Sequence, residues 1–100
     1  MNYYKLLQTD QSYETCVKAI TYDGLLLQYI QKPSEEIIKL ACKQNGYAIT
    51  CAPYQTEEIC KIACAQNGYA LDYVENLTKE ICKIASEQNP WALKKLKKFE

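Results

Sequence analysis

The chain repeats itself every 22 residues, and this period constrains its fold more than any other feature of the sequence. Residues of one kind recur at this spacing in three columns: Glu14, Glu36, Glu58 and Glu80; Ala19, Ala41, Ala63 and Ala85; and Gly24, Gly46, Gly68 and Pro90. A fixed period of this length is typical of a solenoid, in which each unit buries its apolar face only against its neighbours.

Four units align without gaps, and we interpret residues 1–100 as one α-helical repeat domain. The units span residues 14–35, 36–57, 58–79 and 80–100. Residues 1–13 align with the second half of an earlier unit and form a half repeat. A hydrophobic content of 48% is that of a globular chain rather than a disordered one.

Each unit is predicted to form two short helices rather than part of one long helix. Two stretches of eleven residues would also fit a continuous helix, since eleven residues close about three turns. However, Gly46, Gly68 and Pro90 interrupt the units at one position, and Pro33 and Pro53 lie at two junctions. These residues break helices. The predicted fold class is therefore all-α, a short right-handed α-solenoid of helix–turn–helix units.

The first helix of each unit is expected to begin after a hydroxyl residue and to end near a glutamine. Its N-caps are Ser34, Thr56 and Thr78. Its apolar side chains cover an arc of about 200°, which indicates burial on more than one side. The glutamines inside this arc are Gln44, Gln66 and Gln88. Because a buried amide needs hydrogen bonds, we expect these glutamines to tie one unit to the next, with a polar binding row as the alternative.

The second helix of each unit is expected to start at the Gly or Pro position. Pro90 cannot adopt a positive φ, so the first helix of the last unit does not end there in a left-handed residue. Proline favours the first helical position, and asparagine favours the N-cap before it. We therefore predict N-caps at Asn89, Asn67, Asn45 and Asp23. A left-handed stop at the glycines is the alternative.

The six cysteines are interpreted as core residues. They interchange within the repeat with other residue types: Cys16, Cys60 and Cys82 with Ile38, Cys42 and Cys64 with Ile20 and Ser86, and Cys51 with Tyr29 and Tyr73. A cysteine that does so behaves as a small apolar residue. A structural zinc site needs four ligands, usually from Cys-x2-Cys pairs or histidines, and the chain has neither pattern. We expect no metal and no cofactor, with disulfides in an oxidising setting as the alternative.

The charged residues argue against catalysis and against nucleic-acid binding. The chain has no His and no Arg, and its formal net charge is zero. The commonest general base and the bidentate reader of guanine and phosphate are therefore missing. A repeat also distributes residue types evenly, whereas an active site singles some out. We expect no catalytic residue, and therefore a protein that is not an enzyme.

Two recurring columns are the candidates for a partner surface. Tyr47, Tyr69 and Trp91 form an aromatic column, and Lys39, Lys61 and Lys83 form a basic one. Tyr and Trp dominate binding hot spots, but packing between units is the interpretation that we favour for these rings, with a partner-binding groove as the alternative. Each of the three lysines has a glutamate three residues earlier, so an ion pair along the helix is the alternative there.

The two ends of the chain differ in character. The N-terminal half repeat lacks its first helix and carries the apolar residues Tyr3, Tyr4, Leu6 and Leu7. An uncapped solenoid end exposes its stacking face, so this end either folds back or pairs with another copy. The C-terminal end carries Lys94, Lys95, Lys97 and Lys98, which we interpret as a soluble cap that complements the helix dipole. Contact with acidic partners or phosphates is the alternative.

The segment EICKIACAQNGYALDYV, residues 58–74, resembles the repeats of the domain-of-unknown-function family 4116, helical repeats that are abundant in giant DNA viruses of amoebae. The resemblance extends over residues 14–96, and Pro90 departs from the usual glycine. It implies a helical-repeat protein that is viral or acquired from a virus. No activity is assigned to the family, so no functional residue transfers to this chain.

These observations predict a non-enzymatic protein–protein interaction module built on a helical-repeat solenoid, with a protein partner that the sequence does not name. The alternative is a self-assembling or structural component of a giant-virus particle, held together through the N-terminal end. No stretch approaches the roughly 18–20 apolar residues of a membrane span, and the N-terminus does not resemble a secretory signal. We therefore expect a cytoplasmic location, in the host cytoplasm or in the virion.

Overall fold

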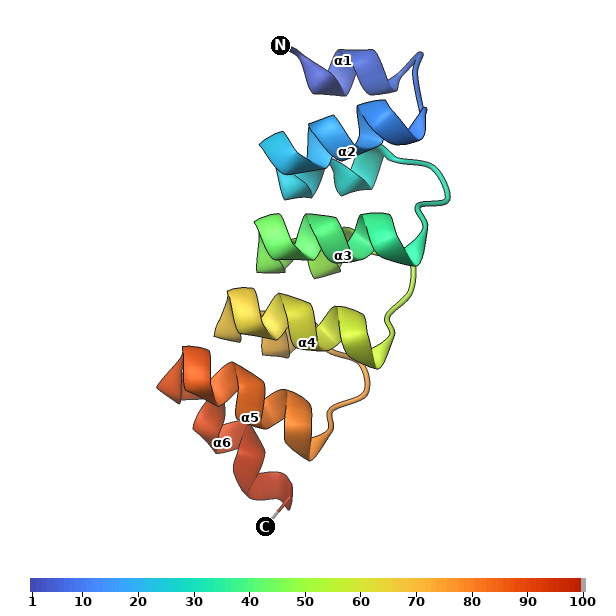
Figure 1. The fold of residues 1–100 in the computed structure, drawn as a ribbon. Coiled ribbons are helices and arrows are strands. Elements are labelled where there is room, and N and C mark those ends of the chain that lie inside the picture. Colours follow the sequence, from blue (N-terminus) through green and yellow to red (C-terminus); the bar gives the residue numbers. More distant parts are fainter. Residues whose placement is uncertain (100) are drawn as a thin grey trace.

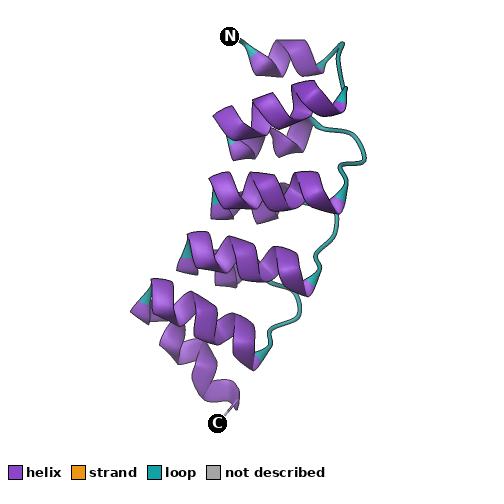
Figure 2. Cartoon of the chain, viewed as in Figure 1, coloured by secondary structure: helices purple, strands orange, loops and turns teal. Residues whose placement is uncertain are grey.

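A computed structural model describes residues 1–99, and every regular element in that range is a helix. Short loops separate the helices (Figure 2). The elements in chain order, with η denoting a 3-10 helix, are α1 (Tyr3–Leu7), α2 (Tyr13–Tyr22), η1 (Gly24–Tyr29), α3 (Glu35–Gln44), η2 (Gly46–Cys51), α4 (Glu57–Gln66), η3 (Gly68–Tyr73), α5 (Lys79–Gln88), η4 (Pro90–Ala92), α6 (Leu93–Leu96) and η5 (Lys97–Phe99).

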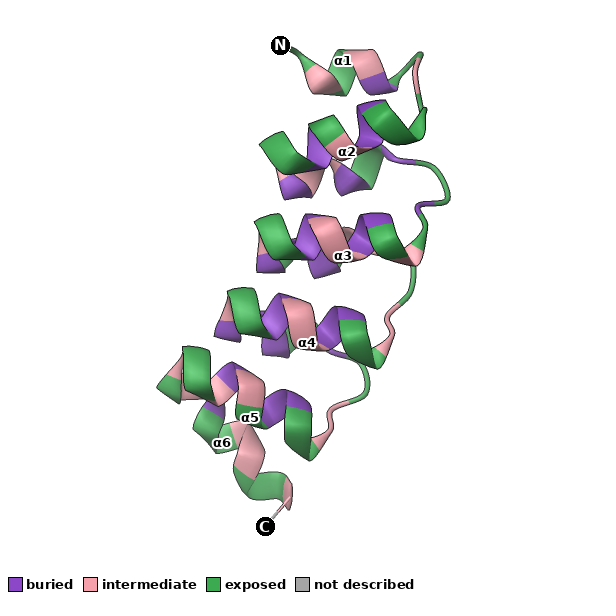
Figure 3. Cartoon of the chain, in the orientation of Figure 1, coloured by how far each residue is buried: buried purple, intermediate pink, exposed green. Residues whose placement is uncertain are grey.

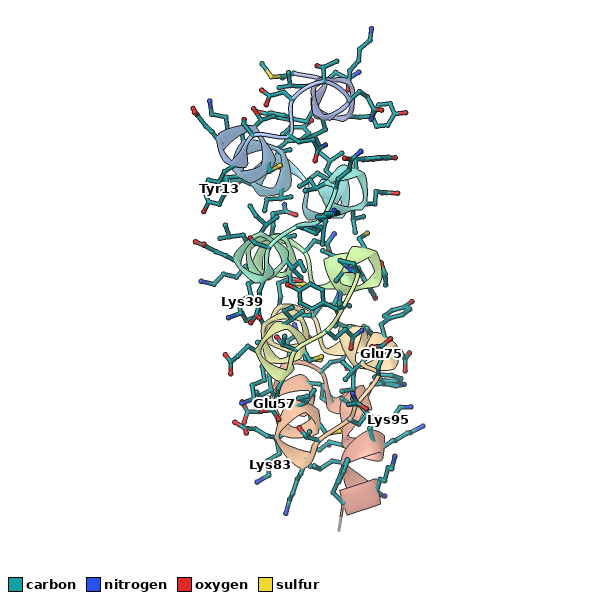
Figure 4. The ribbon with its side chains drawn as sticks, turned by 90° about the vertical axis from the view of Figure 1, so that its right-hand side faces the viewer. Tyr13, Lys39, Glu57, Glu75, Lys83 and Lys95 are labelled. Carbon is teal, nitrogen blue, oxygen red and sulfur yellow. The ribbon has the colours of Figure 1, made fainter. Side chains whose placement is uncertain are left out.

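The helices stack in two rows along an elongated molecule of 49 × 21 × 15 Å. Helices α2 to α5 form the α row, and η1 to η4 form the 3-10 row behind it, continued by α6 and η5 (Figure 1, Figure 4). Consecutive members of each row pack on one another. The chain passes along the α row, returns along the 3-10 row and steps to the next unit, which winds it in a right-handed sense (Figure 1). The predicted all-α solenoid is confirmed.

The two sides where the chain passes between the rows have different structures. On the glycine edge, each α-row helix is followed, after one cap residue, by a 3-10 helix that begins at Gly24, Gly46, Gly68 or Pro90. On the loop edge, residues 30–34, 52–56 and 74–78 connect one unit to the next. In Figure 1 the glycine edge lies at the left and the loop edge at the right.

The predicted helix starts in the α row are confirmed at the level of single hydrogen bonds. The side chains of Ser34, Thr56 and Thr78 each accept a hydrogen bond from the backbone N–H three residues later. Ser12 does the same for α2. Glutamates follow the cap in the first turn of these four helices, where the helix dipole favours negative charge.

The predicted starts in the 3-10 row are confirmed as well. The side chains at these positions accept from the backbone N–H two residues later, and the caps are Asp23, Asn45, Asn67 and Asn89. None of the three glycines has a positive φ, so the left-handed stop considered for the glycines is wrong. Instead, the cap residue is extended and ends one helix while it starts the next.

The second element of each unit is a 3-10 helix, a feature that the repeat pattern did not predict. Six residues of 3-10 helix rise about 12 Å, whereas ten residues of α-helix rise about 15 Å. The stretched helix therefore returns nearly the full length of the α row with fewer residues. This geometry lets a 22-residue unit bring the chain back to the loop edge, where the next unit begins.

The core lies between the two rows and runs along the length of the molecule. The alanine column is fully buried, as are the large apolar residues Ile38, Ile59 and Ile81 of the α row and Leu27, Ile49 and Leu71 of the 3-10 row. Buried residues occur on each helix from α2 to α5 (Figure 3). Five of the six cysteines are buried and Cys51 is half-buried, so the interpretation of the cysteines as core residues holds for five of them.

Candidate partner-binding surface

The glutamines predicted to tie units together do so at the glycine edge. The Gly46 N–H donates to Gln66 Oε1 of the next unit at 2.5 Å. The same bond joins Gly24 to Gln44 at 2.6 Å and Gly68 to Gln88 at 2.7 Å. The glutamine side chains lie at the exposed rim rather than inside the core, which corrects the expectation of buried amides. They are committed to structure, so the alternative of a polar binding row is not supported.

Glycine is required at this edge by a close approach rather than by its backbone angle. A Cβ built on Gly46 would lie 2.5 Å from the carbonyl oxygen of Ala63 and 3.0 Å from Gln66 Oε1. The first of these atoms belongs to the backbone of α4 and cannot swing away. The glycine therefore lets the 3-10 helix of one unit rest directly on the next α-row helix.

A second set of bridging glutamines lies at the loop edge, and the sequence did not reveal it. Gln55 donates from Nε2 to the Tyr73 carbonyl at 2.7 Å, and Gln55 Oε1 accepts from the Glu75 N–H at 3.0 Å. Gln11 makes the matching bonds to Tyr29 and Gln31. The column was hard to recognise because its other members are Pro33 and Leu77.

The aromatic column lies on the outer side of the 3-10 row. Tyr47 and Tyr69 are 37% and 45% exposed, and Trp91 is partly buried. The Tyr69 and Trp91 rings pack on each other with centroids 5.2 Å apart. Packing between units and exposure to solvent are therefore combined in the same rings, as happens for aromatic residues that present an apolar body at a surface.

The structure adds Tyr73 to this column. Tyr73 is 48% exposed, and its ring meets the Tyr47 ring edge-on with centroids 6.1 Å apart. We call the set Tyr47, Tyr69, Tyr73 and Trp91 the aromatic stripe. It crosses η2, η3 and η4, and so runs along the 3-10 row. The repeat contained a signal for Tyr73, since Tyr29 and Tyr73 recur in one column, but Cys51 interrupts that column and hides its aromatic character.

The lysine column does not share a face with the aromatic stripe. Lys39, Lys61 and Lys83 lie on α3, α4 and α5, in the α row. Figure 4 shows Lys39 and Lys83 on the opposite side of the molecule from Lys95. The sequence-based partner surface is thus divided by the structure into an aromatic half and a basic half.

Two lysines of the column, Lys39 and Lys61, are paired with glutamates, and one of the three predicted pairs, Glu58–Lys61, is present. Lys39 pairs with Glu35, four residues earlier, at 3.1 Å rather than with Glu36. Lys61 contacts Glu57, Glu58 and, across the unit boundary, Glu80. Within residues 1–99, Glu80 therefore pairs with the neighbouring unit and not with Lys83. A residue four positions away lies on the same helix face, which favours the observed pairs.

The N-terminal end is covered by its own short helix. Helix α1 packs on α2 and η1. Leu7 is buried there, and the rings of Tyr3 and Tyr4 pack on those of Tyr22 and Tyr29 at 5.4 and 4.6 Å. Tyr4 remains 49% exposed and Leu6 is partly buried. Of the four residues predicted for self-association, Leu7 is therefore turned into the chain itself.

The C-terminal end carries a proline where the inner units have glycine. Pro90 has no N–H to donate to a following glutamine, and its ring occupies the space that Gly46 leaves for the next helix. Helix α6 packs on α5 and η4, and Trp91, Leu96 and Phe99 pack against the core. Pro90 is therefore compatible only with a unit on which no further unit stacks in this register.

A groove of about 200 Å³ lies at the loop edge between the third and fourth units. Its lining includes Gln55, Glu57, Cys60, Asn76 and Ile81. Burial, followed by the nearby carboxylates of Glu75 and Glu57, raises the pKa of the Cys60 thiol, so the thiol stays protonated at neutral pH. In residues 1–99 no group of three or more His, Cys, Asp and Glu residues is arranged to hold a metal ion.

Residues 34–78 match the family described as Domain of unknown function (DUF4116). The resemblance carried by the repeat motif is thereby confirmed for these residues. The matched range runs from the N-cap of α3 to the N-cap of α5, and it contains the unit 36–57 and all but the last residue of the unit 58–79. No curated protein and no solved structure gives a significant match to the chain.

No helix within residues 1–99 combines the length and the apolar character that a bilayer crossing requires.

Proposed function

We propose that this chain is a non-enzymatic module that binds another protein through the aromatic stripe. The observation that carries the proposal is the placement of Tyr47, Tyr69, Tyr73 and Trp91 on three successive elements of one face. Tyr and Trp are enriched at protein interfaces because they provide large apolar area at a low cost in conformational entropy. Ring-to-ring packing supports this role, since it holds the side chains in place before a partner arrives.

The rest of the surface supports a scaffold rather than an enzyme. The recurring contacts between units use the polar groups that the repeat provides, namely the glycine-edge glutamines and the caps. In residues 1–99 no buried side-chain N or O atom lacks a hydrogen-bond partner. Unpaired buried polar groups and strongly perturbed acids or bases are what mark many active sites, and the proposed module needs neither.

The family resemblance supports a viral setting for this module. We propose that it acts in the host cytoplasm or is packaged in a virus particle. Self-assembly through the N-terminal end is the second arrangement that the sequence suggested. It is less well supported, because α1 already covers that end and buries Leu7. Size-exclusion chromatography with light scattering at high protein concentration distinguishes the two: a monomer argues against self-assembly.

Affinity purification with matched variants tests the interaction itself. The wild-type protein, Tyr69→Ser/Tyr73→Ser in the stripe, and Tyr13→Ser/Tyr54→Ser outside it are compared as baits from infected cells. All four tyrosines are exposed, so both variants should fold. A protein that the wild type and the control enrich, but that the stripe variant loses by about tenfold or more, is the expected result. Equal recovery with the stripe variant, or no enriched protein with any bait, would contradict the proposal.

A further inference from the structure

We infer that the protein segment bound by the aromatic stripe is acidic, and that it places apolar side chains on the stripe and carboxylates on the lysines beside it. We call Lys94, Lys95, Lys97 and Lys98 the lysine cluster. This inference rests on the proposed function, because it names the chemistry of the partner at the same surface.

The aromatic stripe and the lysine cluster form one continuous surface. Trp91 ends the stripe, and Lys95 follows it by four residues in α6. The Lys95 Nζ lies 4.0 Å from Asp72 Oδ1, and Asp72 belongs to η3 between Tyr69 and Tyr73. Figure 4 shows Lys95 on the side of the 3-10 row. A segment that crosses the rings therefore reaches Lys95, the first contact with the lysine cluster, without leaving this face.

The charge of this face differs from that of the whole chain. The formal net charge of the chain is zero, and Lys18, Lys39 and Lys61 of the α row pair with glutamates. In contrast, η1 to η4, α6 and η5 contain the four lysines of the cluster and one acidic residue, Asp72, and Glu75 follows η3 on the same side (Figure 4). Lys94, Lys97 and Lys98 are exposed. A positively charged end on an otherwise neutral protein favours a negatively charged partner.

The geometry favours a peptide over a single-stranded nucleic acid. Single strands bind where bases stack on free aromatic faces and where positive charge follows the backbone. Here the rings pack on one another, at interplanar angles of 78° for Tyr47 and Tyr73 and 40° for Tyr69 and Trp91. The lysines are gathered at one end of the stripe, and the charge in its middle is the carboxylate of Asp72. Apolar anchors followed by carboxylates match this order.

Selection from a random peptide library on phage tests the inference, because such a selection does not require a named partner. The folded full chain is the target, and selected peptides are synthesised and titrated while the fluorescence of Trp91, the single tryptophan, is followed. We expect the selected peptides to combine apolar residues with a net negative charge. A uridine 12-mer RNA is titrated in parallel as the nucleic-acid probe.

Two charge-matched variants isolate the lysine cluster. Lys94→Glu/Lys98→Glu should weaken binding of the selected peptides by about tenfold or more, because attraction becomes repulsion at the contact. Lys43→Glu/Lys83→Glu makes the same charge change on the α row and should alter binding by less than about twofold. Circular dichroism confirms that both variants retain their helices.

The possible failures are distinguishable. Selected peptides that lack acidic residues, or that bind the Lys94→Glu/Lys98→Glu variant as tightly as the wild type, overturn this inference while the proposed binding function stands. Tight binding of the uridine RNA with quenching of Trp91 also overturns it, in favour of a nucleic-acid partner. Failure to select any peptide, or selected peptides that Tyr69→Ser/Tyr73→Ser does not weaken, overturns both the inference and the proposed function.

Discussion

The two edges of the solenoid are joined differently. At the glycine edge, a backbone N–H donates to a glutamine of the next unit at three successive junctions. At the loop edge, Gln11 and Gln55 bridge two of the three loops, and Pro33 stands at the equivalent position beside the remaining loop. The first edge does not vary among the inner units. The second edge varies from unit to unit. Both edges nevertheless join the same helices at the same spacing.

The variation at the loop edge is coordinated. Gln11 and Gln55 each accept a hydrogen bond from the N–H twenty residues later. The residue twenty positions after Pro33 is Pro53, which has no N–H. The acceptor and the donor are thus lost together, and no unpaired N–H is left behind. The polar bridge can therefore be absent from this loop, because the acceptor side chain and the N–H donor are both absent.

The glycine edge has no such freedom. Its donor is a backbone N–H that remains in any residue except proline, and its packing partner is the carbonyl of a fully buried alanine. Proline occurs in this column only at Pro90, and within residues 1–99 no further α-row helix packs on that position. The comparison indicates that a position varies when its partner is a side chain or a loop, and not when its partner is a neighbouring helix backbone.

The largest expected effect is at Gly46. Replacing a glycine of ordinary φ by alanine normally stabilises a protein by about 0.4–1 kcal/mol. Here the added Cβ meets the Ala63 carbonyl oxygen, so we expect Gly46→Ala to lower the free energy of unfolding by about 1–3 kcal/mol. Urea unfolding followed by circular dichroism measures it. Pro90→Ala, in the same column without a following unit, is the control and should change stability far less. Stabilisation by Gly46→Ala would refute the close-contact account.

The free energy of unfolding should depend on alkaline pH, because the thiols of Cys42 and Cys64 are buried near the glycine edge. Burial, followed by the nearby thiols, raises the pKa of Cys42 and of Cys64 from 9.0 to about 12. Unfolded thiols ionise near pH 9 while the folded ones keep their protons, so the unfolded chain binds fewer protons and stability falls as pH rises from 9 to 12. The stability of the wild type should fall with a slope of up to about 1.4 kcal/mol per pH unit for each thiol.

Urea unfolding at pH 8 and pH 10 measures this effect. The Cys42→Ala/Cys64→Ala variant should lose much of the pH dependence, whatever its stability at pH 8. An identical dependence in the variant would mean that these thiols are not the groups that titrate. Alkylation of the folded protein gives an independent comparison: the half-buried Cys51 at the loop edge should react before Cys42 and Cys64.

The two kinds of bridging glutamine should differ in how much they contribute to the free energy of unfolding. Gln66→Ala leaves the N–H of the buried Gly46 without its acceptor, and we expect a loss of about 1–2 kcal/mol. Gln55→Ala frees groups at an exposed part of the loop edge, where water can replace the amide, and should cost about 0.5–1 kcal/mol. Both residues are compared by urea unfolding against the wild type. A larger loss at Gln55 would reverse our ranking of the two edges.

The smallest expected effect is a coupling at the third loop. Pro33→Gln alone should change the free energy of unfolding little, because Pro53 has no N–H to donate to the new amide oxygen. Combined with Pro53→Ala, the glutamine acquires a donor, and a double-mutant cycle should show a favourable coupling of about 0.5–1 kcal/mol. No coupling between the two sites would mean that the prolines were not substituted as a pair.

Much of the local structure could be predicted from the sequence. The N-caps of both rows, the ends of the α-row helices at Gln44, Gln66 and Gln88, and the glutamine bridges to the next unit followed from residue type and period. Pro90 was the most useful single residue, because its fixed φ excluded a left-handed stop in the last unit and pointed to helix starts at the equivalent positions of the other units. These features depend on neighbours within one unit or on the period itself.

The candidate surface was only partly predictable. The aromatic and lysine columns both recur every 22 residues, but the period does not say which row a column faces. Tyr73 joins the stripe because the 3-10 row brings its ring to Tyr47, twenty-six residues earlier. The bridge at Gln55 likewise depends on where the following loop returns.

The sequence by itself determined that this protein is a helical repeat, where its helices begin, and which glutamines join its units at the glycine edge, because caps, breakers and the period act over short distances along the chain. Only the tertiary structure decided that the return helices are 3-10, that the aromatic rings and the paired lysines lie on opposite rows, and that the stripe leads to the lysine cluster. These outcomes depend on how one unit rotates onto the next, and that rotation is set by packing between backbones.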